Sequence, residues 1–222
     1  MKSIDICMPI WRAPIDPQIV CSIASLLKMK EYDVNLIVER GFQAAEARNK
    51  LVEKSKADYL FFMDSDSLVT PQDLKQLVED DKDIVSGVYF MRGMPYNPVI
   101  YKTCWQGGFK FLHDVGDGLE RIDGCGMGCC LIKRHVFEKV RSPWFEFNML
   151  GNGSTEDFDF CRKASQEGFQ LWADWRIKIG HVGSYVFSYG DWKRMQDNQK
   201  KIETMGVEKR EIKRKPANKK DS

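Results

Sequence analysis

Short apolar runs alternate with segments of helical periodicity through the first half of the sequence, and this alternation restricts the fold more than any other feature. The runs are residues 4–10, 34–38, 59–63 and 84–89, and the helical segments between them are 17–30, 44–56 and one that begins at Pro71. Such alternation is typical of βαβ units, in which helices connect parallel strands. We therefore predict the α/β class, with a mainly parallel central sheet flanked by helices.

The segment after Thr70 carries the clearest helix signal. Thr70 suits the capping position, and Pro71 suits the first helical position. Asp73 stands at the third helical position, where it can complete a capping box with Thr70. The apolar residues that follow recur at helical spacing, which predicts a helix with one buried stripe.

The second half of the sequence is less regular and is rich in glycine, proline and aromatic residues. Further strands are expected at 99–101, 119–122, 129–133, 170–172 and 176–182, and further helices at 134–140, 155–167 and 191–204. We predict a smaller antiparallel portion here. The 222 residues fit one large domain, 1–205, followed by a basic tail, 206–222, that we expect to be disordered.

Composition indicates a soluble globular protein. Hydrophobic residues make up 43% of the chain and charged residues 30%, and no apolar stretch approaches the roughly 18 residues of a membrane span. No secretory signal is visible, so we predict a cytoplasmic protein without a transmembrane segment. Residues 193–222 carry 11 Lys/Arg against 5 Asp/Glu, and a basic tail of this kind can contact nucleic acid or an anionic membrane surface.

Two carboxylates follow directly after the apolar run at residues 59–63. Asp64 and Asp66 are separated by Ser65 alone. Ligands of open α/β sheets bind outside the carboxyl ends of the strands, where paired carboxylates suit a hard divalent cation. The alternative is a simple turn, since Asp and Ser favour turns.

A second acidic group, Glu156, Asp157 and Asp159, follows the glycines of residues 151–153. A carboxylate here could act as a general base for a hydroxyl group. The alternative is structural, because Ser154 and Asp157 have the spacing of a capping box.

His181 follows Trp175, Ile177 and Ile179 at alternate positions, so we expect it on the apolar side of a strand. A histidine there is usually a satisfied core residue. A neutral imidazole is also a common metal ligand and could complete a site begun by Asp66.

Arg48 lies in a helical segment near the border of its apolar face. Its side chain is either solvated or reaches a diphosphate through two parallel hydrogen bonds.

Trp144 and Trp105 either stack on a sugar or pack in the interior. Gly126 belongs to the run Gly124–Gly128, which matches neither a P-loop nor a dinucleotide fingerprint but permits close approach of the backbone to a ligand.

The seven cysteines do not resemble a disulfide framework, and we expect reduced thiols. Cys125, Cys129, Cys130 and His135 invite a zinc interpretation. The paired knuckles of structural zinc sites are missing from the sequence, so close packing is the favoured interpretation.

Several motifs occur in a fixed order over about residues 2–185. They are a first strand ending in Pro9, Glu46-Ala47-Arg48-Asn49, Phe61–Asp66, Ile84–Tyr89, Pro95–Val99, Gly124–Arg134, Glu156–Cys161 and Gly180–Gly183. Together they resemble the GT-A glycosyltransferases, especially the family-two-like enzymes of bacteria and phages. The resemblance implies a GT-A fold whose smaller antiparallel portion lies on the acceptor side.

The same resemblance implies metal-dependent transfer of a sugar, a hexose by expectation, from a UDP-type or GDP-type nucleotide sugar to an acceptor hydroxyl. It implies that Pro9, Arg48 and Asp64 contact the donor, with Asp64 near the ribose. It further implies that Asp66 and His181 hold Mn²⁺ or Mg²⁺ and that Asp157 is the catalytic base. On the acceptor or sugar side we expect Glu156, Asp159, Trp144 and Gly126.

In-line attack assisted by a base would invert the anomeric centre, and the lack of membrane helices favours a single transfer over polymer synthesis. The acceptor is a glycan or a hydroxymethylated base of phage-type DNA. One alternative is a sugar-phosphate nucleotidylyltransferase, although residues 8–14 supply no glycine-rich loop. Another is a non-enzymatic nucleic-acid-binding module, which the acidic balance of residues 1–192 disfavours.

Overall fold

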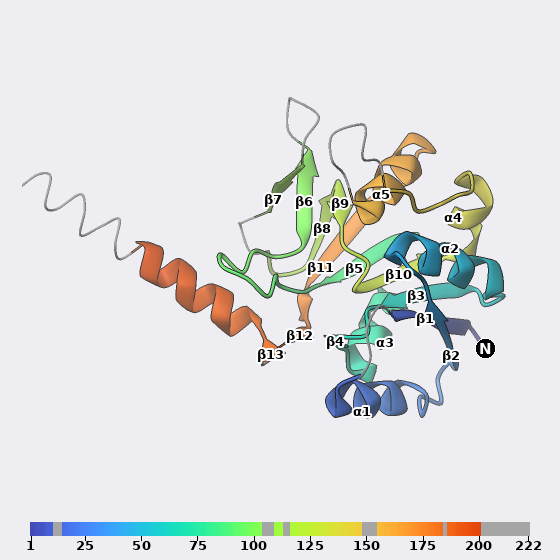
Figure 1. Cartoon of the computed structure of the whole chain (residues 1–222), viewed down its shortest axis with the longest axis horizontal. Helices are drawn as coiled ribbons and strands as arrows, with labels where there is room; N and C mark the ends of the chain where they lie inside the picture. Colours follow the sequence, from blue (N-terminus) through green and yellow to red (C-terminus); the bar gives the residue numbers. More distant parts are fainter. Residues whose placement is uncertain (11–14, 104–108, 113–115, 148–154, 184–185, 201–222) are drawn as a thin grey trace, which may run out of the picture.

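The computed structural model describes residues 1–10, 15–103, 109–112, 116–147, 155–183 and 186–200, and a seven-stranded sheet forms its centre (Figure 1). In spatial order the strands are β2 (Asp33–Arg40), β1 (Ser3–Ile10), β3 (Tyr59–Met63), β10 (Cys129–Lys133), β5 (Ile84–Val88), β11 (Leu171–Lys178) and β8 (Leu119–Ile122). β1 pairs in parallel with β2 and β3, and β11 pairs in parallel with β5. β10 and β8 run antiparallel to their neighbours. The predicted α/β class with a mainly parallel sheet is confirmed.

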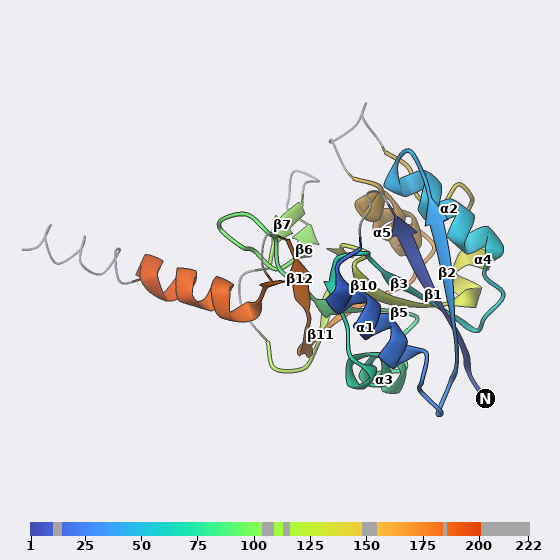
Figure 2. The same ribbon diagram turned by 60° about the horizontal axis from the view of Figure 1, so that its bottom comes forward.

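The residues of β3 are buried on both faces of the sheet, as the unbroken apolar run predicts. Leu60 and Phe62 join one core cluster, while Phe61 and Met63 join the other. α1 (Pro17–Leu26) and α3 (Pro71–Glu79) cover the Phe61 face, and α2 (Ala44–Lys54), α4 (Arg134–Lys139) and α5 (Glu156–Gln166) cover the opposite one (Figure 2). The result is a sheet between two helical layers.

The helix predicted after Thr70 is confirmed as α3. The Thr70 side chain accepts a hydrogen bond from the Asp73 backbone N–H, and the Asp73 carboxylate accepts one from the Thr70 N–H. Pro71 occupies the first turn, where a missing N–H leaves no bond unmade. This reciprocal cap fixes the start of the helix at Pro71, five residues beyond Asp66.

Two small sheets complete the fold. One contains β13 (Val186–Phe187), β12 (Gly180–Val182) and β4 (Ser67–Leu68), and the other contains β7 (Phe109–Phe111), β6 (Ile100–Thr103) and β9 (Gly124–Cys125). Both are antiparallel, as expected for the second half. The short β4 was not predicted, because two residues carry no periodic signal.

The division into strands 170–172 and 176–182 is wrong. β11 runs without interruption from Leu171 to Lys178, and the chain then leaves the central sheet to form β12. The register of β11 shifts between Asp174 and Lys178, where the buried Asp174 carboxylate pairs with Arg176. β12 pairs with β4 instead, and this pairing places His181 opposite Ser67.

Helical residues continue from 189 to 200 and project from the body of the protein (Figure 1). Trp192 anchors this segment by packing its buried ring against Phe90. Among the described helices, none combines the length and apolar character that a membrane span requires. The predicted tail, residues 206–222, and Trp105 lie outside the described residues.

Candidate active site

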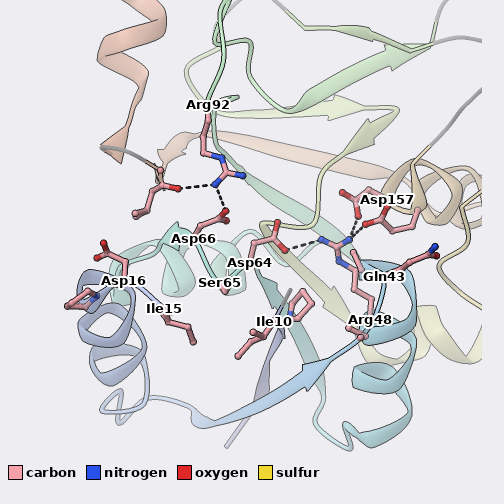
Figure 3. A pocket seen from close by; sticks show the side chains of 18 residues that line it. Ile10, Ile15, Asp16, Gln43, Arg48, Asp64, Ser65, Asp66, Arg92 and Asp157 are labelled. Atoms are coloured by element: carbon pink, nitrogen blue, oxygen red, sulfur yellow. Dashed lines mark hydrogen bonds and ion pairs between the residues drawn. The ribbon is translucent and has the colours of Figure 1, made fainter. Parts of the chain in front are cut away.

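A cleft of about 1040 Å³ opens at the carboxyl ends of β1 and β3. Pro9 and Ile10 line it from the end of β1, and the residues after β3 line its floor. Figure 3 shows Asp64 between Asp66 on one side and Asp157 on the other. The sheet thus brings together in one cleft residues that are about 90 positions apart in the sequence.

The turn after β3 directs the two aspartates to different partners. The Asp64 N–H donates to the Gly128 carbonyl at 3.3 Å, and the Ser67 N–H donates to the Asp64 carbonyl at 3.0 Å. With the backbone held in this way, the Asp64 side chain faces Arg48 and the Asp66 side chain faces His181. The expected turn is present, and it directs the two carboxylates to different sides.

Arg48 is the centre of a buried charge cluster, which we call the Arg48 cluster: Arg48, Asp64, Glu156 and Asp157. Its Nη2 lies 3.0 Å from Asp64 Oδ1, and its Nη1 lies 2.8 Å from Asp157 Oδ1 and contacts Glu156. Only 3% of Arg48 is exposed, so the solvated interpretation of this residue is wrong. The helix places it against the sheet, where three carboxylates compensate its desolvation.

Burial changes the acidity of the Arg48 cluster. Desolvation raises the pKa of Asp157 to about 7; the Arg48 charge opposes that rise, and the charges of Glu156 and Asp64 add to it. Desolvation lowers the pKa of Arg48, but the three carboxylates outweigh it and hold the pKa above its ordinary value. The Asp157 Oδ2 also accepts a hydrogen bond from the Met127 N–H at 3.3 Å. Asp157 is therefore a fixed carboxyl group whose pKa burial raises toward neutral pH.

Asp66 forms a second, more open group with His181 and Arg92. Its Oδ1 lies 3.3 Å from His181 Nε2, and its Oδ2 lies 2.9 Å from Arg92 Nη1. Burial raises the pKa of Asp66, but the hydrogen bond and charge of His181, together with the Arg92 charge, outweigh burial and leave the pKa below its ordinary value. Asp66 is thus an anion surrounded by cationic or cation-binding groups.

The geometry of Asp66 and His181 fits a divalent cation. His181 Nδ1 lies 2.9 Å from the Phe90 carbonyl, which can only accept, so this partner assigns the proton to Nδ1. In a neutral ring the Nε2 lone pair then faces a carboxylate oxygen, and two acceptors at 3.3 Å need a proton or a cation between them. Adjacent ligands of an octahedral cation lie about 3 Å apart, close to this separation. In the described part of the chain no three His, Cys, Asp or Glu side chains are arranged to hold a metal. Asp66 and His181 are two side chains that could hold one at this place.

Two other expected residues, Asp159 and Trp144, lie away from the cleft lining. Asp159 is 2% exposed and pairs with Arg162 and Lys163. Trp144 packs edge to face on Phe137 and donates its indole N–H to the Phe137 carbonyl. Their side chains are engaged within the fold.

The close approach expected at Gly126 is to a side chain. A Cβ at this position would lie 1.9 Å from the Tyr89 hydroxyl oxygen, so no other residue fits without movement of the tyrosine ring. Ser154, the supposed capping residue, lies outside the described residues; Thr155 precedes the first turn of α5, and Asp157 bonds instead to Arg48 and Met127.

Sequence reasoning missed Arg92, which lines the cleft opposite Arg48. A signal was available: Arg92 follows shortly after the end of β5, just as Asp64 and Asp66 follow β3. The rule that strand ends supply ligand-binding residues applies to both strands, since they run in the same direction.

Comparisons with known proteins identify the family and the fold of this chain. The family model described as glycosyl transferase family 2 matches residues 17–141, a range that includes Asp64 and Asp66 but neither Asp157 nor His181. A197 from STIV, a solved structure, is 21% identical with a TM-score of 0.57, and the match covers 82% of this chain and 86% of that one. GalNAc-T7, solved with UDP, GalNAc and Mn²⁺, is 14% identical with a TM-score of 0.58, and the match covers 82% of this chain and 44% of that one. At these identities the likeness establishes a shared fold. A search of curated protein sequences found no match.

Proposed function

Because this chain belongs to glycosyl transferase family 2, we propose that its cleft transfers a sugar from a nucleoside diphosphate sugar to a hydroxyl group of a glycan. One observation carries the proposal. The cleft holds two separate acidic centres, Asp66 with His181 at one side and Asp157 at the other, with Asp64 between them (Figure 3). Inverting transfer of a sugar uses two such centres, because charge develops on the leaving diphosphate while a base takes the proton of the attacking hydroxyl.

The donor would bind on the Asp66 side of the cleft. Asp66 and His181 would hold Mn²⁺ or Mg²⁺, which supplies positive charge to the diphosphate when bound. The UDP and Mn²⁺ with which GalNAc-T7 was solved support this class of ligand. Pro9 lines the cleft beside β1, and Asp64, whose side chain is 27% exposed, retains surface for a ribose hydroxyl.

Asp157 would act as the base on the opposite side. Its pKa of about 7 suits a group that accepts a proton from a hydroxyl at neutral pH. Arg48 and the Met127 N–H hold its two oxygens, and each carboxylate oxygen can accept a further hydrogen bond. Attack from this side, opposite to the leaving diphosphate, would invert the anomeric centre.

Calorimetry of UDP and GDP, each with and without Mn²⁺, tests the donor class, and a screen of nucleotide sugars for metal-dependent hydrolysis then identifies the donor. We expect tight nucleotide binding only with the metal. Asp66→Asn should weaken that binding, whereas Asp117→Asn, an exposed site away from the cleft, should leave it unchanged. Equal nucleotide binding with and without metal would contradict the assignment of Asp66 and His181.

Acceptor classes are separated by offering the enzyme oligosaccharides and hydroxymethylated DNA in parallel with the identified donor. We expect transfer to the oligosaccharides. Transfer to the DNA alone would replace the glycan in this proposal by a DNA-linked hydroxyl, without changing the roles of Asp66 and Asp157.

A further inference from the structure

Arg92 has an unusual position for a cleft residue, because its guanidinium pairs with the Asp66 carboxylate that would bind a metal ion. Its Nη1 lies 2.9 Å from Asp66 Oδ2 and donates to the Val182 carbonyl at 3.3 Å (Figure 3). Both Asp66 oxygens are therefore engaged, one by Arg92 and the other by His181. A divalent cation at Asp66 would meet a guanidinium already bound there.

The charge of the cleft gives Arg92 a second possible partner. The described residues that line the cleft include the acids Asp16, Asp64, Asp66, Glu156 and Asp157, and the cations Arg48 and Arg92. A nucleoside diphosphate is itself an anion, so its entry into this acidic cleft requires added or redirected positive charge. Arg48 is buried and held by three carboxylates, which leaves Arg92 as the lining cation best able to reach the ligand.

Arg92 also has the freedom that such a change requires. About half of its side chain is exposed (49%), against 4% for Arg48. It lies in a bend beyond the end of β5, and a Cβ placed on the neighbouring Gly93 would have no heavy atom within 4 Å. Among the described residues, the Asp66 carboxylate and the Val182 carbonyl bind the guanidinium.

We propose that Arg92 is an exchangeable counter-ion, which neutralises Asp66 in the empty cleft and moves to the donor diphosphate when a divalent cation binds Asp66. The inference rests on the proposed function. Two cations at one carboxylate repel each other, whereas a diphosphate attracts both, so the exchange is favourable only when metal and nucleotide are both present. Arg92 thereby makes the two binding events depend on each other.

The proposal predicts opposite effects of one substitution on two equilibria. In Arg92→Gln, Mn²⁺ alone should bind about three- to tenfold more tightly, because its competitor at Asp66 is gone. The nucleoside diphosphate, measured with saturating Mn²⁺, should bind about tenfold more weakly, because a phosphate contact is lost; both changes are within the range of known coupling between sites. An arginine that served only the fold, or only the donor, would not change the two affinities in opposite directions.

The experiment uses the full chain and does not depend on catalysis. Electron paramagnetic resonance counts free Mn²⁺ in titrations without nucleotide, and calorimetry measures UDP or GDP, whichever the wild type binds more tightly, with Mn²⁺. Arg92→Lys keeps the charge and should restore most of the metal–nucleotide coupling. Arg121→Gln, an exposed arginine of β8 outside the cleft lining, is the matched control and should behave as wild type.

The outcomes separate this inference from the proposed function. Tighter Mn²⁺ binding with weaker nucleotide binding in Arg92→Gln supports the exchange. If the wild type binds metal and nucleotide together but Arg92→Gln changes neither affinity, or lowers both, the exchange is overturned and the proposed function stands. If the wild type binds neither nucleotide with Mn²⁺, the proposed function fails, and the exchange fails with it.

Discussion

The two sides of the cleft hold their carboxylates in opposite ways. In the Arg48 cluster a guanidinium with 4% of its side chain exposed joins Asp64, Glu156 and Asp157. On the other side Arg92, with 49% exposed, makes one ion pair with Asp66. Burial strengthens the first group of charges and makes each member dependent on the others, whereas solvent screens the second.

This difference corresponds to two tasks. A group that removes a proton from an acceptor must already be in place before the reaction, and a buried cluster with few alternative arrangements achieves that. A group that receives and releases a charged ligand must be able to exchange partners, and a half-exposed pair allows this. Substitutions on each side test whether the two sides differ as strongly as their burial indicates.

Removing the central cation should have the largest effect. Arg48→Met leaves three buried carboxylates without their partner, and breaking a buried ion pair from one side destabilises a protein by about 3–5 kcal/mol. We expect a loss of that size in the free energy of unfolding, measured by urea titration, together with loss of transfer. Arg121→Met, on the exposed edge strand, should change stability by less than about 0.5 kcal/mol. A stable Arg48→Met variant would show that the carboxylates take up protons without difficulty.

Asp157→Asn should reduce the rate of transfer rather than binding. The amide keeps the shape of the side chain but cannot accept the proton, and a positioned base contributes typically about 10²–10⁴-fold to a rate. We expect kcat to fall by about a thousandfold, while calorimetry shows nucleotide affinity within about twofold of wild type. Turnover at the wild-type rate would transfer the role of base to Glu156, whose carboxylate lies in the same cluster.

On the open side, Asp66→Asn should act on binding. Loss of the anionic ligand leaves His181 alone to hold a cation, and we expect Mn²⁺-dependent nucleotide affinity to fall about 10- to 100-fold. Unfolding should change little, since Asp66 is 30% exposed at its side chain. If Asp66→Asn lowered the free energy of unfolding strongly and left the nucleotide affinity unchanged, Asp66 would have a structural role like that of the Arg48 cluster.

The pH dependence of transfer should follow Asp157. With a pKa of about 7, the ionised fraction rises about tenfold between pH 6 and pH 8, so the rate should rise over that range and then level off. The effect on stability has the opposite sign: the folded state holds this proton more tightly than the unfolded chain does, so the contribution of Asp157 is full below about pH 4 and is lost as pH rises through 7. Rate profiles of wild type and Asp117→Asn should coincide. A rate that falls from pH 6 to pH 8 would exclude a basic role for Asp157.

The sequence was most informative where local signals and burial agree. The unbroken apolar run predicts both bounds of β3, and the capping residues Thr70 and Asp73 predict the first residue of α3, because both signals depend on neighbours in the chain. The same run identified Asp64 and Asp66 as residues at a strand end.

Long-range placement was harder to predict. Local signals did not predict the path of residues 171–182. The register of β11 shifts beside the buried Asp174, which pairs with the exposed Arg176, and β12 pairs with the two-residue β4. Arg48 illustrates the same limit: helical periodicity placed it at the border of an apolar face, but the three carboxylates that make its burial possible come from elsewhere in the chain. No spacing within α2 indicates those partners.

The smallest expected effect is that of Arg92→Gln on the free energy of unfolding. It allows a direct comparison of Arg92 with Arg48. An exposed ion pair contributes about 0–1 kcal/mol, because solvent screens the charges and the long side chain loses freedom when it is held. We expect the free energy of unfolding of Arg92→Gln to lie within about 1 kcal/mol of wild type, and the difference to shrink further when salt is raised from 0.05 to about 0.5 M. Urea titrations at the two salt concentrations, with Arg48→Met alongside, measure both arginines on one scale. If Arg92→Gln destabilised the protein as much as Arg48→Met and did so equally at high salt, Arg92 would be a structural member of the fold like Arg48, and the open side of the cleft would be as fixed as the buried one.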